Sequence, residues 1–86
     1  MQGYTLVPNK LFDTDELSYV TQSLGMWLCF LCQQSITGEH STNLKALEGL
    51  VGHDLTDGDM YRLAHAGIIT YEHNGNAWKV KLVQSL

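Results

Sequence analysis

Hydrophobic residues in the first half of the chain recur at the spacing of an α-helix. They fall three or four residues apart and form one stripe: Leu17, Val20, Leu24, Leu28 and Leu31. Asp13 and Thr14 precede the stripe as candidate N-caps, and Asp15 and Glu16 would occupy the first turn, where the helix dipole favours negative charge. The pattern predicts a long first helix that buries one side.

A second apolar stripe runs along the same predicted helix. Tyr19, Met26 and Phe30 are spaced by seven and four residues and lie away from the first stripe. Either the N-terminal strand and the C-terminal hairpin cover this second face, or it is the interface between two subunits. We treat Tyr19, Met26 and Phe30 as a candidate dimer interface and expect a homodimer.

A second helix is predicted after a loop from Ser35 to His40. Ser41 or Thr42 would be its N-cap, and Gly52 would end it in the left-handed conformation. Its expected apolar face comprises Leu44, Leu47, Leu50 and Val51.

A third helix is predicted to begin at Thr56. Asp59 follows three residues later, which is a capping-box pattern, and Gly67 supplies the stop. Its expected inward residues are Met60, Leu63 and Ala64. Because the connection between the second and third helices is short, the pair reads as a helix-turn-helix.

The end of the chain predicts a β-hairpin. Residues 68–72 and 77–82 alternate as strands do, and Asn74-Gly75 between them is a preferred centre for a two-residue turn. Centring the turn there pairs Tyr71 with Trp78, Ile69 with Val80 and Thr70 with Lys79. Residues 3–7 predict one more short strand, which Pro8 ends.

These elements together predict an α+β fold of the winged-helix kind, in which a short N-terminal strand and three helices precede a hairpin wing. The 86 residues suit one domain, spanning 1–86. The longest apolar run, 24–32, is far shorter than the roughly 20 residues that cross a bilayer. Cys29 and Cys32 lie inside a predicted helix among apolar neighbours, so we expect two buried, reduced cysteines and a cytoplasmic protein without a membrane partner.

Two segments resemble known families. Residues 3–11, Gly-Tyr-Thr-Leu-Val-Pro-Asn-Lys-Leu, resemble the start of the winged-helix domains at the N-terminus of phage replication-organiser proteins. Residues 63–69, Leu-Ala-His-Ala-Gly-Ile-Ile, resemble the passage from the third helix into the wing of winged-helix regulators. The resemblance implies a third helix that enters the major groove of DNA and a wing that touches the backbone.

Carried onto this chain, that implication gives a set of candidate DNA-binding residues: Tyr61, Arg62, His65, Lys79 and Lys81. Two features oppose it. The net charge is −4, whereas phosphate-binding proteins are usually basic, and the third helix opens with Asp57 and Asp59, which would face phosphates.

No catalytic constellation, metal site or cofactor motif is predicted, because no nucleophile lies at a recognisable spacing from a histidine and the histidines show no ligand pairing. Two functions remain. We expect a small winged-helix DNA-binding regulator, phage- or plasmid-borne and acting as a dimer. The alternative is a winged helix that binds a protein, through the second stripe of the first helix or the acidic front of the third. A positive band joining Arg62 to Lys79 and Lys81 would favour double-stranded DNA.

Overall fold

The computed structural model describes residues 7, 9–12, 17–75 and 77–83. They form a short 3-10 helix, three α-helices and three strands. In chain order these are the 3-10 helix Asn9–Leu11, α1 Tyr19–Gln34, β1 Glu39–Thr42, α2 Leu44–Val51, α3 Asp57–His65, β2 Ile69–Asn74 and β3 Ala77–Leu82. The fold is therefore α+β.

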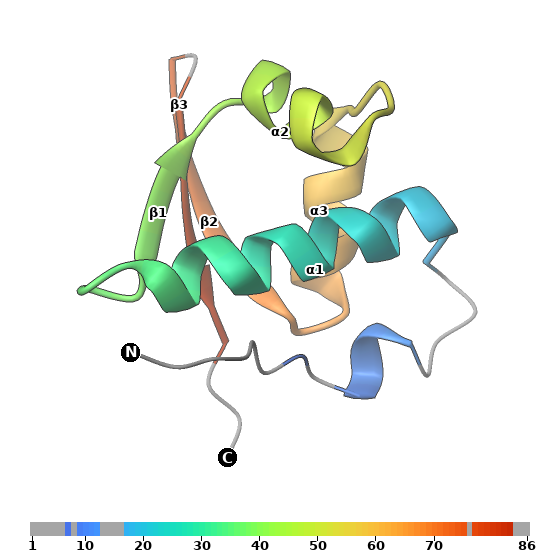
Figure 1. Ribbon diagram of the computed structural model, residues 1–86, viewed down its shortest axis with the longest axis horizontal. Coiled ribbons are helices and arrows are strands. Elements are labelled where there is room, and N and C mark those ends of the chain that lie inside the picture. Colours follow the sequence, from blue (N-terminus) through green and yellow to red (C-terminus); the bar gives the residue numbers. More distant parts are fainter. Residues whose placement is uncertain (1–6, 8, 13–16, 76, 84–86) are drawn as a thin grey trace.

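The helices and the sheet form two layers around one core. In Figure 1 the antiparallel sheet stands to one side, and α1 crosses in front of α3. Leucines of α1 meet Met60 and Leu63 of α3, as well as Trp78 and Val80 of β3. The predicted inward stripe is confirmed, because Leu24 and Leu28 of α1 are buried and Val20 and Leu31 are partly buried. Leu17 is also buried, although it precedes the helix.

The start of α1 differs from the prediction. The helix begins at Tyr19, and its N-cap is Ser18, whose hydroxyl accepts a hydrogen bond of 3.2 Å from the Thr21 amide. The expected start at Asp13 or Thr14 is therefore wrong; those residues, with Asp15 and Glu16, lie outside the described part. A serine whose side chain satisfies a first-turn amide is a sufficient start signal.

Strand β1 was not predicted. Residues 39–42 pair antiparallel with β3, so β3 is the middle strand and the sheet order is β1-β3-β2. The sequence Glu-His-Ser-Thr has no apolar alternation, and the pairing supplies backbone hydrogen bonds to an otherwise open edge of β3.

The strand at 39–42 also moves the start of α2. The expected caps Ser41 and Thr42 are in β1, and Asn43 is the N-cap instead, with its Oδ1 2.8 Å from the Ala46 amide nitrogen. Leu50 is exposed rather than part of the apolar face. The predicted stop at Gly52 is confirmed by its φ of 83°.

The limits of α3 match the prediction. Thr56 is the N-cap, and its amide donates to Asp59 Oδ2 at 2.9 Å. Gly67 has a φ of 80°, which is the left-handed conformation expected of the stop. Met60 and Leu63 are buried and Ala64 is partly buried, so the inward side of α3 was also predicted correctly.

The hairpin forms, but its register differs. Strand β2 continues to Asn74, which pairs with Ala77, so Gly75 is the first residue of the turn; Asn76 lies outside the described residues. Tyr71 is opposite Val80, Ile69 opposite Leu82 and Thr70 opposite Lys81. A shift of two positions leaves each side chain on its predicted face.

The shifted register places His73 opposite Trp78. Their rings stack with centroids 4.0 Å apart and planes 8° from parallel. The longer strand and this ring contact favour the observed pairing over the one centred on Asn74-Gly75. The strand predicted at residues 3–7 falls almost wholly outside the described residues, and Val7 is not in a strand.

Candidate interaction surfaces

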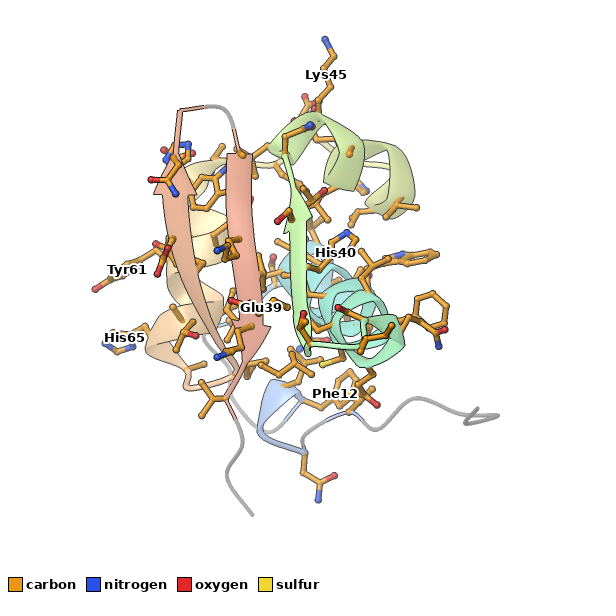
Figure 2. All side chains as sticks on the ribbon, turned by 90° about the vertical axis from the view of Figure 1, so that its left-hand side faces the viewer. Phe12, Glu39, His40, Lys45, Tyr61 and His65 are labelled. Carbon is orange, nitrogen blue, oxygen red and sulfur yellow. The ribbon has the colours of Figure 1, made fainter. Side chains whose placement is uncertain are left out.

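The outward side of α3 presents three of the predicted site residues together. Tyr61, Arg62 and His65 are all exposed, and the rings of Tyr61 and His65 lie 5.8 Å apart, one helical turn from each other. Figure 2 shows Tyr61 and His65 pointing away from the molecule beyond the edge of the sheet. Helix α3 therefore offers a free surface of mixed aromatic and polar character.

Only one of the two aspartates of α3 lies on that surface. Asp57 is exposed, whereas Asp59 is 9% exposed and turns inward. Its Oδ1 accepts a hydrogen bond from the Thr21 hydroxyl at 3.1 Å, and its Oδ2 accepts from the Thr56 amide. The expectation that Asp59 faces outward is wrong, because this carboxylate caps α3 and fastens it to α1.

Asp59 also engages the single cation of α3. Arg62 Nη1 lies 3.4 Å from Asp59 Oδ1, an ion pair between residues three apart in the helix. The guanidinium side chain is 55% exposed, so the pairing is partly screened by water. Arg62 is nevertheless drawn toward the start of its own helix, where a carboxylate offsets its charge.

Lys79 and Lys81 occupy a different face. They alternate along β3 with Trp78 and Val80, which are buried against the helices, so both lysines project from the open side of the sheet. Figure 2 looks onto this open side, with the helices behind the strands. The sheet thus lies between the two lysines and the core against which α3 packs.

Acidic residues are the cross-strand neighbours of both lysines. Lys79 lies opposite Glu72 of β2, and Lys81 lies opposite Glu39 of β1. Directly opposite side chains share a face, with Cβ atoms about 4.5–5.5 Å apart. The open side of the sheet therefore carries alternating charges whose fields largely cancel, and the described residues form no positive band from Arg62 to Lys79 and Lys81.

The outer face of α1 exposes three large apolar side chains. Tyr19 is 87% exposed, Met26 46% and Phe30 40%. The hairpin does not cover these side chains, and they do not belong to the described core; the N-terminal strand, the other expected cover, falls almost wholly outside the described residues. Helix α1 also contains no Asp, Glu, Lys or Arg between Tyr19 and Gln34.

An open hollow of about 520 Å³ adjoins the second stripe. It is lined by Val7, Ser23, Met26, Trp27 and Phe30. The Trp27 and Phe30 rings meet edge to face with centroids 6.0 Å apart. Ser23 and Trp27 were not among the predicted site residues. Ser23 lies within the second stripe at helical spacing, and its small side chain leaves the hollow open.

The two cysteines are buried on the inner side of α1, as predicted. Both are free thiols, and Cys32 Sγ lies 3.5 Å from the Val80 carbonyl oxygen. Burial raises the pKa of the Cys29 thiol to about 11. Burial, and then the neighbouring Cys29, raise the pKa of Cys32 to about 11. A protonated thiol in an apolar layer is a poor nucleophile and a poor metal ligand.

The histidines are dispersed. His40 is in β1, His53 between α2 and α3, His65 on α3 and His73 on β2. Across the described residues, no three His, Cys, Asp or Glu side chains gather closely enough to hold a metal ion.

Among the described helices, none combines the length and the apolar character needed to cross a membrane. The chain matches no protein-family model, no curated protein and no solved structure.

Proposed function

We propose that this chain is a non-enzymatic interaction module with a winged-helix layout, and that it binds protein through the outer face of α1. The element order supports the layout: a helix, a strand, a short-turn helix pair and a hairpin, with β3 between β1 and β2. The resemblance to phage replication-organiser proteins rests on residues 3–11, of which 3–6 and 8 lie outside the described part, so that origin stays a prediction.

The observation on which the proposal depends is the composition of the α1 face. Tyr19, Met26 and Phe30 are exposed on a helix without a charged residue, and Trp27 lines the adjacent hollow. The central parts of protein–protein interfaces are enriched in aromatic residues and Met and depleted of charge. An isolated exposed apolar side chain needs no explanation, but a contiguous uncharged group of them indicates a binding surface.

Affinity capture with matched baits tests this function. We expect wild-type protein and the Ile36→Glu variant to retain the same partner, and Phe30→Glu to lose it. Ile36 is a fully exposed apolar residue just beyond α1, so it controls for the added charge. Retention of every partner by Phe30→Glu, together with an oligomeric state unchanged by the substitution, would contradict binding through α1.

DNA binding through α3 is the second candidate. It is favoured by one observation, the exposure of Tyr61, Arg62 and His65 on the helix that follows a short turn. The charge distribution is unfavourable, since Arg62 is paired with Asp59 and Lys79 and Lys81 face elsewhere. Arg62 is the one Arg or Lys of α3, so a dimer would make about 2 phosphate contacts, and log affinity against log salt would have a slope of only about −2.

Duplex selection at low salt separates the two candidates. If α3 contacts the bases, Arg62→Ala should change the selected sequence. The double variant Lys79→Ala, Lys81→Ala should leave that sequence unchanged. If the selection enriches no sequence, the DNA candidate is lost. If a specific duplex is enriched and Phe30→Glu binds it normally while retaining every protein partner, DNA replaces protein as the ligand.

A further inference from the structure

The exposed stripe of α1 has a spacing that reads the same in both directions. Tyr19, Ser23, Met26 and Phe30 are separated by four, three and four residues. Such intervals place all of them on one side of the helix. Their centre lies between Leu24 and Gly25, which point to the interior and are buried.

This symmetry matters for an antiparallel pair of helices. When two identical helices cross antiparallel about a two-fold axis at the centre of the stripe, Tyr19 of one lies opposite Phe30 of the other. Ser23 then lies opposite Met26. Ring faces ring at both ends, and a small side chain faces a long one in the middle, so that each Met26 has the hollow beside Ser23 available to it.

The charges also fit a second copy. A two-fold interface brings a surface against itself, so any net charge on it repels its own image. The whole chain has a net charge of −4, but α1 contributes nothing to it. Among the exposed apolar positions of the described residues, the α1 stripe combines several large side chains with no Asp, Glu, Lys or Arg on its own helix.

We infer that the occupant of the α1 face is a second copy of this chain, bound as an antiparallel α1–α1 pair about a two-fold axis between residues 24 and 25. This inference rests on the proposed function, because it names the protein that α1 binds. The proposed contact involves a few side chains of one helix, and small interfaces are typical of weak, transient pairs, so we expect the dimer to dissociate at low concentration rather than be obligate.

Sedimentation equilibrium from micromolar to millimolar concentration is the first test. The wild type and Ile36→Glu should dimerise alike, and Met26→Glu and Phe30→Glu should raise the dimer dissociation constant about tenfold or more. Circular dichroism and thermal unfolding of each variant establish that it is folded. A wild type that stays monomeric overturns the inference, as does a dimer that both stripe variants preserve.

A mixing experiment tests the antiparallel register. Each homodimer of Tyr19→Lys or of Phe30→Glu loses both ring pairs, whereas their antiparallel heterodimer retains one and sets Lys against Glu at the other end. Native mass spectrometry of the equimolar mixture should therefore show the heterodimer in excess. Parallel helices would oppose each position to itself, so the heterodimer would lose both contacts; its absence from the mixture overturns the proposed register.

The outcomes distinguish this inference from the proposed function. A monomer that still captures a different protein, and loses it on Phe30→Glu, retains the function and overturns the second copy. A monomer in which neither stripe variant changes capture overturns both. A monomeric wild type whose Met26→Glu variant unfolds assigns the stripe to the interior of the chain and likewise overturns both.

Discussion

The hydroxyl of Thr21 in α1 donates a buried hydrogen bond of 3.1 Å to the carboxylate of Asp59 in α3. Thr21 is fully buried, and the two residues lie 38 positions apart in the chain. The same carboxylate accepts from the Thr56 amide and pairs with Arg62. One side chain thus caps α3, fixes it against α1 and attracts its only cation, so the orientation of α3 depends on a polar contact inside the core.

Removing either partner of this contact should destabilise the fold. Thr21→Val preserves the shape but removes the donor, and we expect a loss of about 1–2 kcal/mol. Asp59→Ala should cost about 2–3 kcal/mol, since the Thr56 amide loses its cap as well. Urea unfolding of the two single variants and the double variant gives the coupling energy, expected at about 1 kcal/mol or more.

Asp57→Ala is the matched control, because Asp57 is exposed in the same first turn of α3. Its effect should stay within about 0.5 kcal/mol. Equal stabilities for Thr21→Val and the wild type would show that the Thr21 contact does not contribute.

The same substitution should have opposite effects at two glycines. A Cβ at Gly25 would lie 2.6 Å from Leu11 Cδ1 and 3.1 Å from Leu63 Cδ2, both in the core. Gly25→Ala should therefore cost about 1 kcal/mol net, since overpacking of about 1–3 kcal/mol exceeds the gain in helix propensity of up to about 1 kcal/mol.

Gly49, in α2, is the counterpart with open space around it. Gly49→Ala should stabilise the protein by about 0.5–1 kcal/mol through propensity alone. Thermal unfolding of both variants measures the two signs. If Gly25→Ala stabilised the protein instead, the Leu11 side chain would have to move aside without a loss of packing energy.

Gly75 should tolerate no β-branched residue. Its φ is 60°, in the first position of the hairpin turn. Gly75→Val should destabilise the domain by about 1 kcal/mol or more, because a branched side chain opposes the left-handed conformation. Ala77→Val, at an exposed strand position two residues later, should be neutral or stabilising. Equal melting temperatures for the two variants would argue against the observed turn.

The thiols should be unreactive in the folded protein. With a pKa of about 11 for Cys29 and Cys32, the thiolate is a very small fraction at pH 8. Iodoacetamide should label both cysteines quickly in urea and slowly without it. Rapid labelling of the native protein would contradict their burial.

Because burial raises the pKa of both thiols, we expect the free energy of unfolding to fall at high pH. The unfolded chain ionises its thiols near the ordinary value of 9.0, before the folded protein does at about 11. The contribution of the protonated thiols to the free energy of unfolding is thus fully present below pH 9 and is lost as the pH rises through 11. A Cys29→Ala, Cys32→Ala variant should show a shallower fall in unfolding free energy over that interval than the wild type. Equal slopes would contradict the prediction.

Local patterns predicted the helices, their stops and the hairpin because each signal acts within a few residues. Gly52 and Gly67 end helices by their own backbone freedom, and Thr56 with Asp59 starts one. The inward stripe of α1 was likewise readable from its spacing. The outward stripe was also readable, but the sequence left open whether another part of the chain covered it.

Several of the errors depend on a contact partner that the local hydrophobic pattern does not reveal. Strand β1 is specified by pairing with β3 and has no apolar pattern of its own. Asp59 turns inward because its carboxylate accepts a hydrogen bond from Thr21. The hairpin register is favoured by a ring contact between His73 and Trp78. The cancellation of charge at Lys79 and Lys81 follows from Glu72 and Glu39, which only the sheet places beside them.

The central position of β3 has a consequence for aggregation. With the apolar Trp78 and Val80, β3 is a strand with which a strand of another molecule could pair. However, β1 and β2 already pair with both of its edges. The exposed edges left by this order are β1, four polar residues long, and β2, which includes Glu72 and His73. Short, polar or charged edges are poor templates for further strands. A four-residue segment without hydrophobic character thereby protects the sheet from edge-to-edge polymerisation.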